Sequence, residues 1–496
     1  MPKIVQQHID SETKVFLIQN SEIENHLRKN IFEQLGFKGN YKQTIYLPES
    51  NELYIGVSYK SASKTYDPFS RVNYFELGVT LTKNLPKKIN QISIEKFGDN
   101  SNLKDLFDFV LGAFQAAWTF DKYLNSQKSN RKEFNLVFGS ELGVATDQNF
   151  VNSIEVYNRG LTLTRTIIDE TPEELNPQSI VDIIKNELGS NSRMTLKFLD
   201  AEKMSQMGMN SILAVGRASR YQPVLVHAVL KPLNDVKRKI CLIGKGLTYD
   251  SGGMDIKTEG HMKTMKCDMG GAATMFGTIK ILSELQLQHT EVHWISAFAE
   301  NMVDANSYKS DDIITTLSGQ TVEVINTDAE GRLTLADALT YATLENPDYI
   351  VDAATLTGAC VMALSPFYTA LMGNDKNLAD SLQASFEREG DRTVHVPMPE
   401  VLREFVTGKI SDLINTSYGG VKSGHVTAGL FLSHFVDQNL FRNQNLKISS
   451  PKVFNWAHLD IAGSAYNEGQ NLLGYNGATG QTVRGLVGWV LSVDQE

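Results

Sequence analysis

The stretch Thr321–Ala342, TVEVINTDAEGRLTLADALTYA, decides how this chain is interpreted. Its first residues carry the apolar pattern of a strand, and from Leu333 onward leucine and alanine recur at helical spacing. Between these patterns, Asp328, Glu330 and Arg332 are predicted to lie on a strand-to-helix turn. Open α/β sheets bind ligands at the carboxyl ends of their strands, so the turn is a candidate site.

Two carboxylates held this close repel each other, and a divalent cation is the usual way to stabilise such a pair. On its own, however, an Asp-x-Glu-Gly turn is more often a solvated turn with a helix-capping aspartate. The metal interpretation therefore depends on the rest of the chain.

Composition predicts a soluble globular protein with more than one domain. The chain has 496 residues, of which 42% are hydrophobic and 21% charged. A net charge of −10 argues against nucleic acid as the main partner, because phosphate binding needs a basic surface. The longest apolar run, Phe109–Phe120, is too short to span a membrane, and the amino terminus has no secretory pattern, so a cytoplasmic protein is expected.

The order of strand and helix patterns predicts an α/β protein. Residues 1–158 are expected to form an amino-terminal α/β domain, residues 159–180 a linker helix region, and residues 181–496 the domain that carries the chemistry. In the first domain, strands are expected at 13–19, 41–47, 51–59, 71–82 and 134–139, with a helix at about 102–124.

A second stretch with chemical potential is Lys239–Gly271. Here Lys245 ends a buried strand between two glycines, and Asp250 follows before a Gly-Gly turn. The spacing does not match a phosphate-binding P-loop. Asp268 stands among methionine and glycine residues, and a buried carboxylate there would need a cation.

Four segments, GKGLTYDSGG, MKCDMGGAAT, NTDAEGRLTLADAL and DAATLTGA, resemble in order and spacing the leucyl aminopeptidase family, the cytosolic M17 metallopeptidases. Asn326–Leu333 matches that family's signature at every position. The resemblance implies a macro-domain-like α/β amino-terminal domain, followed by a mixed-sheet α/β catalytic domain with helices on both faces. It also implies a leucyl aminopeptidase that removes amino-terminal residues from peptides with a free amino terminus, and a homo-hexamer.

The resemblance further implies roles for individual residues. Two divalent metal ions per subunit would be bound by Lys245, Asp250, Asp268, Asp328 and Glu330. The catalytic groups would be Lys257 and Arg332, and the substrate would contact Met265, Asn326, Thr355 and Gly358. A bicarbonate ion held by Arg332 would act as the general base. The residues at Met254-Asp255 and around His261 differ from those usual in the family. These differences bear on which substrate side chains and which metals the protein prefers.

Elementary chemistry is consistent with these roles. Four carboxylates balance two divalent cations, and an oxygen-rich set with one amine suits Zn²⁺ or Mn²⁺, with Co²⁺ or Mg²⁺ as further candidates. Lys245 can bind a metal only as the neutral amine, so its proton must be displaced. Lys257, if charged, could stabilise an oxyanion.

Other interpretations stay open at this point. Lysines and arginines are most often solvated, methionines most often fill cores, and lone histidines such as His261, His425 and His458 are most often hydrogen-bonded structural residues. Cys267 is interpreted as a small apolar residue that fills space in the core. The alternatives to the enzyme are a non-catalytic or DNA-binding regulatory protein with the same fold, and a di-metal phosphoesterase.

Overall fold

The computed structural model describes residues 2–5, 12–58, 73–86, 89–97, 102–125, 128–139, 142, 147–418, 423–469, 473 and 476–496. The chain divides into two compact units: Met1–Thr162 with Glu468–Asn476, and Leu163–Asn467 with Gly477–Glu496. One helix, α5 (Gln148–Asp169), continues through the position where the sequence placed the start of a linker. A short segment near the carboxyl terminus also belongs to the amino-terminal unit, which no local sequence pattern signalled.

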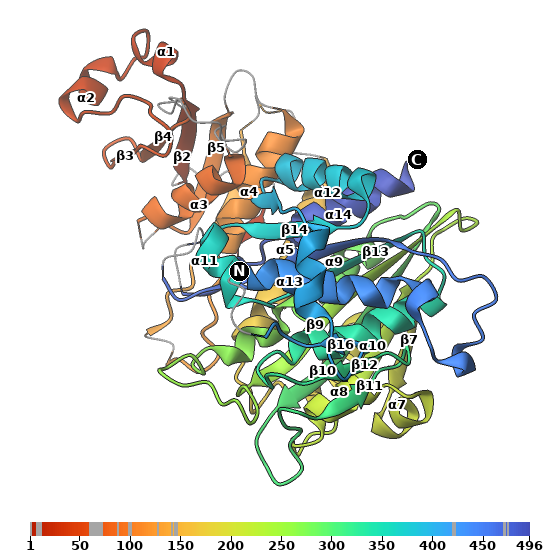
Figure 1. Ribbon diagram of the computed structural model, residues 1–496. Coiled ribbons are helices and arrows are strands. Elements are labelled where there is room, and N and C mark those ends of the chain that lie inside the picture. The colour runs from red at the N-terminus through yellow and green to blue at the C-terminus, as the bar shows by residue number, and fades with distance from the viewer. Residues whose placement is uncertain are drawn as a thin grey trace. The chain divides into compact units, whose positions relative to one another are not determined.

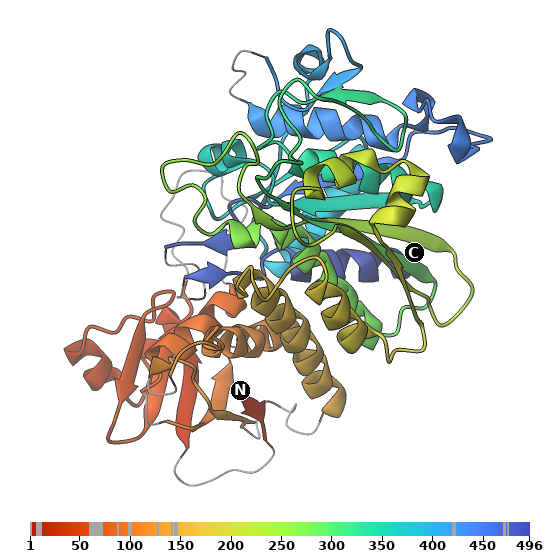
Figure 2. The ribbon, with the colours of Figure 1, turned by 90° about the horizontal axis from the view of Figure 1, so that it is seen from below.

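The amino-terminal unit contains a six-stranded sheet, seen with its red and orange strands side by side in Figure 2. In sheet order the strands are β1 (Lys3–Ile4), β6 (Asn135–Phe138), β5 (Gln91–Phe97), β2 (Thr13–Ile18), β4 (Glu52–Gly56) and β3 (Thr44–Leu47). All neighbours pair in parallel except β3 and β4. The helices wholly in this unit are α1 (Asn20–Ile23), α2 (Lys29–Gln34), α3 (Tyr74–Asn84) and α4 (Leu103–Ala117).

One expected strand of this unit is wrong. Residues 71–82 were expected to be extended, but Tyr74–Asn84 form helix α3, while residues 59, 71 and 72 lie outside the described residues. The helix forms because Leu77 and Leu81 share one face and pack into the core with α4. At Gly78 the two helices approach so closely that a Cβ would lie 1.9 Å from the carbonyl oxygen of Phe109. This tertiary contact outweighs the strand preference of the local sequence.

The larger unit is built on an eight-stranded mixed sheet (Figure 1). In sheet order its strands are β15 (Thr393–His395), β14 (Thr369–Gly373), β17 (Asn455–Asp460), β13 (Tyr349–Ala354), β9 (Arg238–Asp250), β10 (Thr290–Asn301), β8 (Val224–Leu230) and β7 (Met194–Leu199). The central strands β17, β13, β9 and β10 run in parallel, whereas β14, β8 and β7 introduce antiparallel pairs. The expected α/β class with a mixed sheet is therefore confirmed.

Helices cover both faces of this sheet. On one face, Cys241 and Ile243 of β9 pack in a cluster that includes α10 (Gly331–Leu344). Side chains alternate along a strand, and on the opposite face Gly244 lies against α9 (Gly270–Glu284). The remaining helices of the unit are α6 (Ser179–Leu188), α7 (Ala201–Met207), α8 (Asn210–Gly216), α11 (Gly358–Leu364), α12 (Lys376–Glu389), α13 (Gly424–Ser433) and α14 (Val483–Asp494).

The stretch Thr321–Ala342 forms the expected strand, turn and start of a helix, but its strand is not part of the main sheet. Strand β12 (Thr321–Glu323) lies between β11 (Ile313–Thr315) and β16 (Leu413–Ile414) in a small sheet. The remaining two-stranded sheet pairs β18 (Tyr466–Asn467) with β19 (Gly477–Ala478). The turn after β12, which carries Asp328 and Glu330, therefore approaches the edge of the main sheet from the small sheet and not from one of the main strands.

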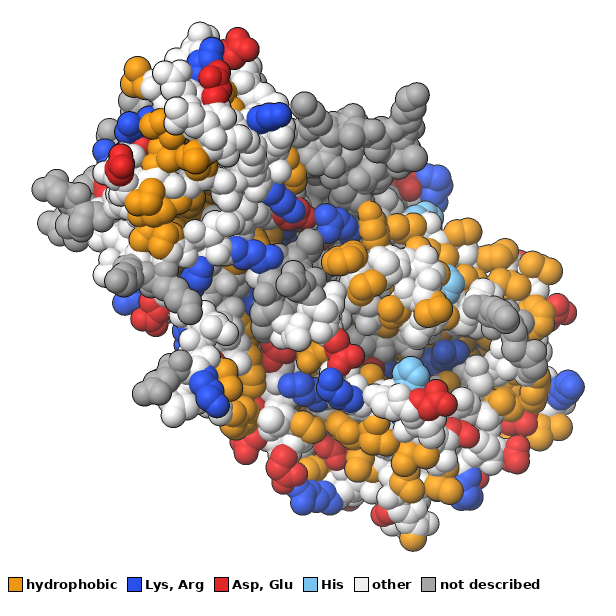
Figure 3. Space-filling model, turned by 90° about the vertical axis from the view of Figure 1, so that its left-hand side faces the viewer, with side chains coloured by type: hydrophobic (Ala, Val, Ile, Leu, Met, Phe, Trp, Pro, Cys, Tyr) orange, Lys and Arg blue, Asp and Glu red, His pale blue; other side chains and the backbone are white. Residues whose placement is uncertain are grey.

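The surface shows a mixture of charges. On the face drawn in Figure 3, lysine and arginine side chains are interspersed with aspartate and glutamate. Within the described part of the chain, none of the helices combines the length and apolar character needed to cross a membrane.

Candidate active site

The ends of neighbouring strands position the expected metal ligands. Strand β9 carries Lys245 and ends at Asp250, and both side chains are buried. Glycine before Lys245 allows close packing here, because a Cβ on Gly244 would lie 2.4 Å from Cα of Ala272 in α9. The parallel strands β10 and β13 end at the same edge of the sheet. Side chains that follow these strands therefore face one shared space.

The ammonium group of Lys245 joins two carboxylates. Its Nζ donates to Oδ1 of Asp268 at 2.8 Å and to the carbonyl oxygen of Thr355 at 3.0 Å. It also lies 3.0 Å from Oε1 of Glu330. Burial by itself would lower the pKa of Lys245, but the charges of Asp268 and Glu330 outweigh burial and raise this pKa.

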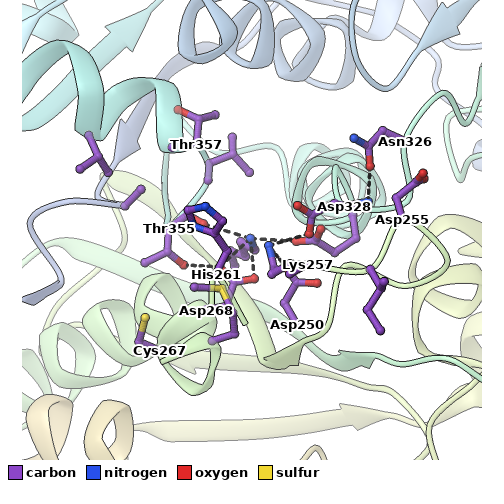
Figure 4. A pocket seen from close by; sticks show the side chains of 18 of the residues that line it. Asp250, Asp255, Lys257, His261, Cys267, Asp268, Asn326, Asp328, Thr355 and Thr357 are labelled. Carbon is purple, nitrogen blue, oxygen red and sulfur yellow. Dashed lines mark hydrogen bonds and ion pairs between the residues drawn. The ribbon is translucent and has the colours of Figure 1, made fainter. Parts of the chain in front are cut away.

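Lys257 makes the equivalent connection between the other two carboxylates, as the dashed lines in Figure 4 show. Its Nζ lies 2.8 Å from Oδ2 of Asp250 and 2.5 Å from Oδ1 of Asp328. Burial opposes the charge of Lys257, yet Asp250 and the neighbouring acids raise its pKa. The site thus consists of two ammonium groups, each held between two carboxylates.

The four carboxylates carry more negative charge than the two lysines neutralise. Burial, followed by the charge of Asp250, raises the pKa of Asp328 to about 7. Burial also raises the pKa values of Asp268 and Glu330. One oxygen from each of Asp250, Asp268 and Glu330 lies within 4.8 Å of the others. The cluster is therefore short of positive charge.

This donor set fits divalent cations. Oε2 of Glu330 is buried and has no hydrogen-bond partner among the described residues, so it has a free lone pair for a metal. Four carboxylates with one amine suit ions that accept oxygen and nitrogen ligands. Cations here would compete with Lys257 for Asp250 and Asp328, and Lys245 could join them as a ligand only after losing its proton.

Several residues that hold the ligands in place were missed in the sequence. Nδ2 of Asn301, at the end of β10, donates to Oδ1 of Asp250 at 2.9 Å and to the carbonyl oxygen of Thr327 at 3.0 Å. Oδ2 of Asp255 accepts from the backbone N–H of Thr327 at 2.7 Å. Asn301 belongs to no short motif. Its position at the carboxyl end of a buried strand was the one feature of the sequence that could have indicated a place in the site.

Arg332 lies beside the cluster but does not line the cavity. It is in the first turn of α10 and is 7% exposed, and its Nε and Nη1 have no hydrogen-bond partner within the described part of the chain. Burial lowers its pKa to about 10, although Glu330 and Asp460 act in the other direction. A buried guanidinium with free donors suits a small planar anion.

The cluster opens into a cavity of about 480 Å³. All the expected site residues except Arg332 line it, including Met265, Asn326 and Gly358. Thr355, expected to bind substrate, also donates from Oγ1 to Oδ1 of Asp268 at 2.9 Å. Further lining residues that the sequence did not place in the site are Asp255, Ile256, Thr258, His261, Cys267, Leu356, Thr357, Val361 and Ala462.

The chain is similar to known proteins over most of its length. Residues 162–487 match the model of the cytosol aminopeptidase family, catalytic domain. A probable cytosol aminopeptidase of Persephonella marina is 38% identical over 411 residues, which cover 81% of this chain and 76% of that protein. A probable cytosol aminopeptidase of Wolinella succinogenes is 32% identical over 98% of this chain and 97% of its own length. The crystal structure of the cytosol aminopeptidase from Coxiella burnetii superposes with a TM-score of 0.81 at 26% identity and covers 98% of each chain.

Proposed function

The chain belongs to the cytosol aminopeptidase family and is a peptidase, and on this premise we propose that it is a metal-dependent aminopeptidase with a preference for leucine-like amino-terminal residues. The observation that carries the proposal is the group of four buried or half-buried carboxylates joined by two lysines at the wall of a cavity of about 480 Å³. The substrates would be peptides with a free amino terminus.

Five residues would hold two divalent cations: Lys245, Asp250, Asp268, Asp328 and Glu330. Zn²⁺ and Mn²⁺ suit this set best, with Co²⁺ and Mg²⁺ as further candidates. When bound, such a pair of ions would supply Lewis-acid chemistry and lower the pKa of a water molecule. The chain's contribution is to keep Asp250 and Asp268 buried and correctly oriented through Asn301 and Thr355.

Lys257 would stabilise the oxyanion that forms when the peptide carbonyl is attacked. Its side chain reaches into the cavity, and a lysine ammonium group is ordinarily charged at neutral pH. Arg332 would hold bicarbonate, which would serve as the general base. The unpartnered Nε and Nη1 of this buried side chain support that role.

Four residues of the cavity wall would bind the substrate: Met265, Asn326, Thr355 and Gly358. A Cβ added to Gly358 would meet no heavy atom within 4 Å, so the wall is open at that point and leaves room for a substrate side chain. We also propose a cytoplasmic homo-hexamer, on the basis of the family resemblance.

The test is hydrolysis of leucine p-nitroanilide by protein that has been stripped of metal and then resupplied with Mn²⁺ or Zn²⁺. Activity should return with metal, and should be absent with the N-acetylated substrate and in Asp328→Ala. Asp182→Ala, which removes a carboxylate whose side chain is 79% exposed, serves as the matched control. If the remetallated protein is inert on all peptides offered but hydrolyses a phosphate ester, the peptidase site assignment is wrong.

A further inference from the structure

A second group of potential metal ligands lies in the larger unit, at the other end of the sheet from the cavity. His227 is in β8, His293 is near the start of β10, and Glu345 follows the last residue of α10. One ligand atom from each of the three residues lies within 4.8 Å of the others. The candidate active site, by contrast, adjoins Asn301 at the end of β10.

The two histidines face each other through nitrogen atoms. Nε2 of His227 lies 2.9 Å from Nδ1 of His293, and both rings are buried. The other ring nitrogen of His293, Nε2, lies 2.9 Å from Oε1 of Glu291. A carboxylate on the far nitrogen holds the proton there, so Nδ1 of His293 presents a lone pair to the group. Metal-binding histidines in proteins are commonly oriented by a carboxylate in this way.

Both imidazoles are in the protonation state that a metal needs. Burial, followed by the neighbouring His293, lowers the pKa of His227 to about 3. Burial also lowers the pKa of His293, although Glu291 opposes this effect. Neutral imidazoles can donate their lone pairs without first losing a proton at neutral pH.

From this arrangement we infer a third metal site, in which Nε2 of His227, Nδ1 of His293 and the carboxylate of Glu345 bind a Zn²⁺ ion. Two imidazoles with one carboxylate form a ligand set that selects zinc over magnesium or calcium. The inference does not depend on the proposed function of the cavity.

The spacing of the ligand atoms is close to what the ion requires. Two nitrogens bound to tetrahedral zinc stand about 3.3 Å apart, given Zn–N bonds of about 2.0–2.1 Å. The present separation is 2.9 Å, so the rings need to move apart by about 0.4 Å. Oε2 of Glu345 is 3.9 Å from Nδ1 of His293, and its side chain is 32% exposed, which leaves it free to turn and gives the ion a route of entry.

A metal-free alternative uses the same atoms. Nζ of Lys197 donates to the hydroxyl of Tyr341 at 3.1 Å, and that hydroxyl lies 3.1 Å from Nδ1 of His227. If the hydroxyl donates to Nδ1 of His227, then Nε2–H of His227 can donate to His293, and the chain of hydrogen bonds ends at Glu291 without a metal ion. In the zinc-bound form, Nδ1 of His227 instead carries the proton and donates to Tyr341, which still accepts from Lys197.

The site would join the end of α10 to strands β8 and β10. The opposite end of the same helix follows Glu330 and carries Arg332, which belong to the candidate active site. Zinc at this position would hold the carboxyl end of the helix against the two strands, at the opposite end of the helix from the candidate active site.

The test is zinc-edge anomalous diffraction on crystals of the full chain treated with Zn²⁺, together with zinc counting after gel filtration. We expect an anomalous peak between His227 and His293, and about one zinc per chain fewer in His293→Gln than in the wild type. His289→Gln, at a half-buried histidine just before the same strand, should keep the wild-type count.

Glu345→Gln provides a second variant at the half-exposed ligand, in case His293→Gln does not fold. It should also lose the extra zinc while retaining the ions of the cavity. A wild-type crystal with zinc at the cavity but no peak at the histidines would overturn the inference. Equal zinc counts in the wild type, Glu345→Gln and His293→Gln would do the same.

Discussion

Gly331 leaves the space that the side chain of Lys245 fills: a Cβ at position 331 would lie 2.5 Å from Cε and 2.6 Å from Nζ of Lys245. Both residues are buried, and Lys245 is held by Asp268 and Glu330. The glycine at the start of α10 is therefore required by the position of the lysine.

Gly331→Ala is expected to displace Lys245 and to weaken metal binding by about 10–100-fold, the range seen when a group that positions a ligand is lost. The helix itself should form normally, since alanine favours helix more than glycine by about 1 kcal/mol. Competition with a coloured chelator measures the affinity. Gly358→Ala is the control, because it also starts a helix and its Cβ would meet no atom within 4 Å. Equal affinities in the two variants would contradict the packing argument.

Asn301 is expected to act on the metals through Asp250. Asn301→Ala removes the N–H donors to Asp250 and Thr327, so the carboxylate loses its orientation and metal affinity should fall by about 10–100-fold. Isothermal titration with Mn²⁺ tests this expectation. Asn306→Ala, in the exposed loop after the same strand, should bind the metal as the wild type does. Unchanged binding by Asn301→Ala would exclude the positioning role.

Lys257→Met should separate catalysis from metal binding. Removing the ammonium group is expected to lower kcat by about 10²–10³, the usual effect of losing one oxyanion donor. Metal binding should be retained or become tighter, because Lys257 no longer competes for Asp250 and Asp328. Steady-state kinetics and metal titration are measured on the same preparation. A loss of activity that excess metal reverses would show that Lys257 serves binding instead.

Arg332 is expected to make activity depend on bicarbonate. Even with its pKa lowered to about 10, the guanidinium remains charged at pH 7–8 and can hold the anion. Activity of the wild type in carbon-dioxide-free buffer should rise when bicarbonate is added, whereas Arg332→Met should be low and insensitive to it. Arg388→Met, at a half-exposed arginine in α12, is the control. A bicarbonate response that survives in Arg332→Met would rule out this residue as the anion site.

The buried pair of His458 and Asp352 is expected to make stability depend on pH. Nδ1 of His458 lies 2.6 Å from Oδ1 of Asp352; burial opposes protonation, but the charge and hydrogen bond of Asp352 outweigh it and raise the pKa of His458 above 6.5. A raised folded-state pKa contributes stability that is complete below the unfolded pKa of about 6.5 and is lost as pH rises through the folded value.

His458→Gln should therefore cost about 3–5 kcal/mol of unfolding free energy at pH 6, as expected when a buried pair loses one partner. The cost should be smaller at pH 9, because the stability that the raised pKa contributes is lost as pH rises. Urea unfolding of metal-free protein at the two pH values measures the difference. A cost that is the same at both pH values would show that His458 is neutral throughout.

The sequence predicted part of the fold directly. Periodicity placed α10 well, because the helix is long and has one consistent pattern, whereas the strand expected to end at Lys245 continues as β9 to Asp250. It was wrong at Tyr74–Asn84, where valine, threonine and aromatic residues suggested a strand and the contact with α4 produced a helix. It left the sheet partners of β12 open, because a strand's partners are not encoded in its own residues.

The sequence by itself determined the family, and it predicted the acids and lysines of the candidate site, since these lie in short motifs whose residue types and spacing are distinctive. Only the tertiary structure decided which charges meet: Lys245 with Asp268, and Lys257 with Asp250 and Asp328. The same is true of Asn301 and of the histidine pair in β8 and β10. The physical reason is that these contacts join residues far apart in the chain, and their distances follow from strand order and register, which local patterns do not contain.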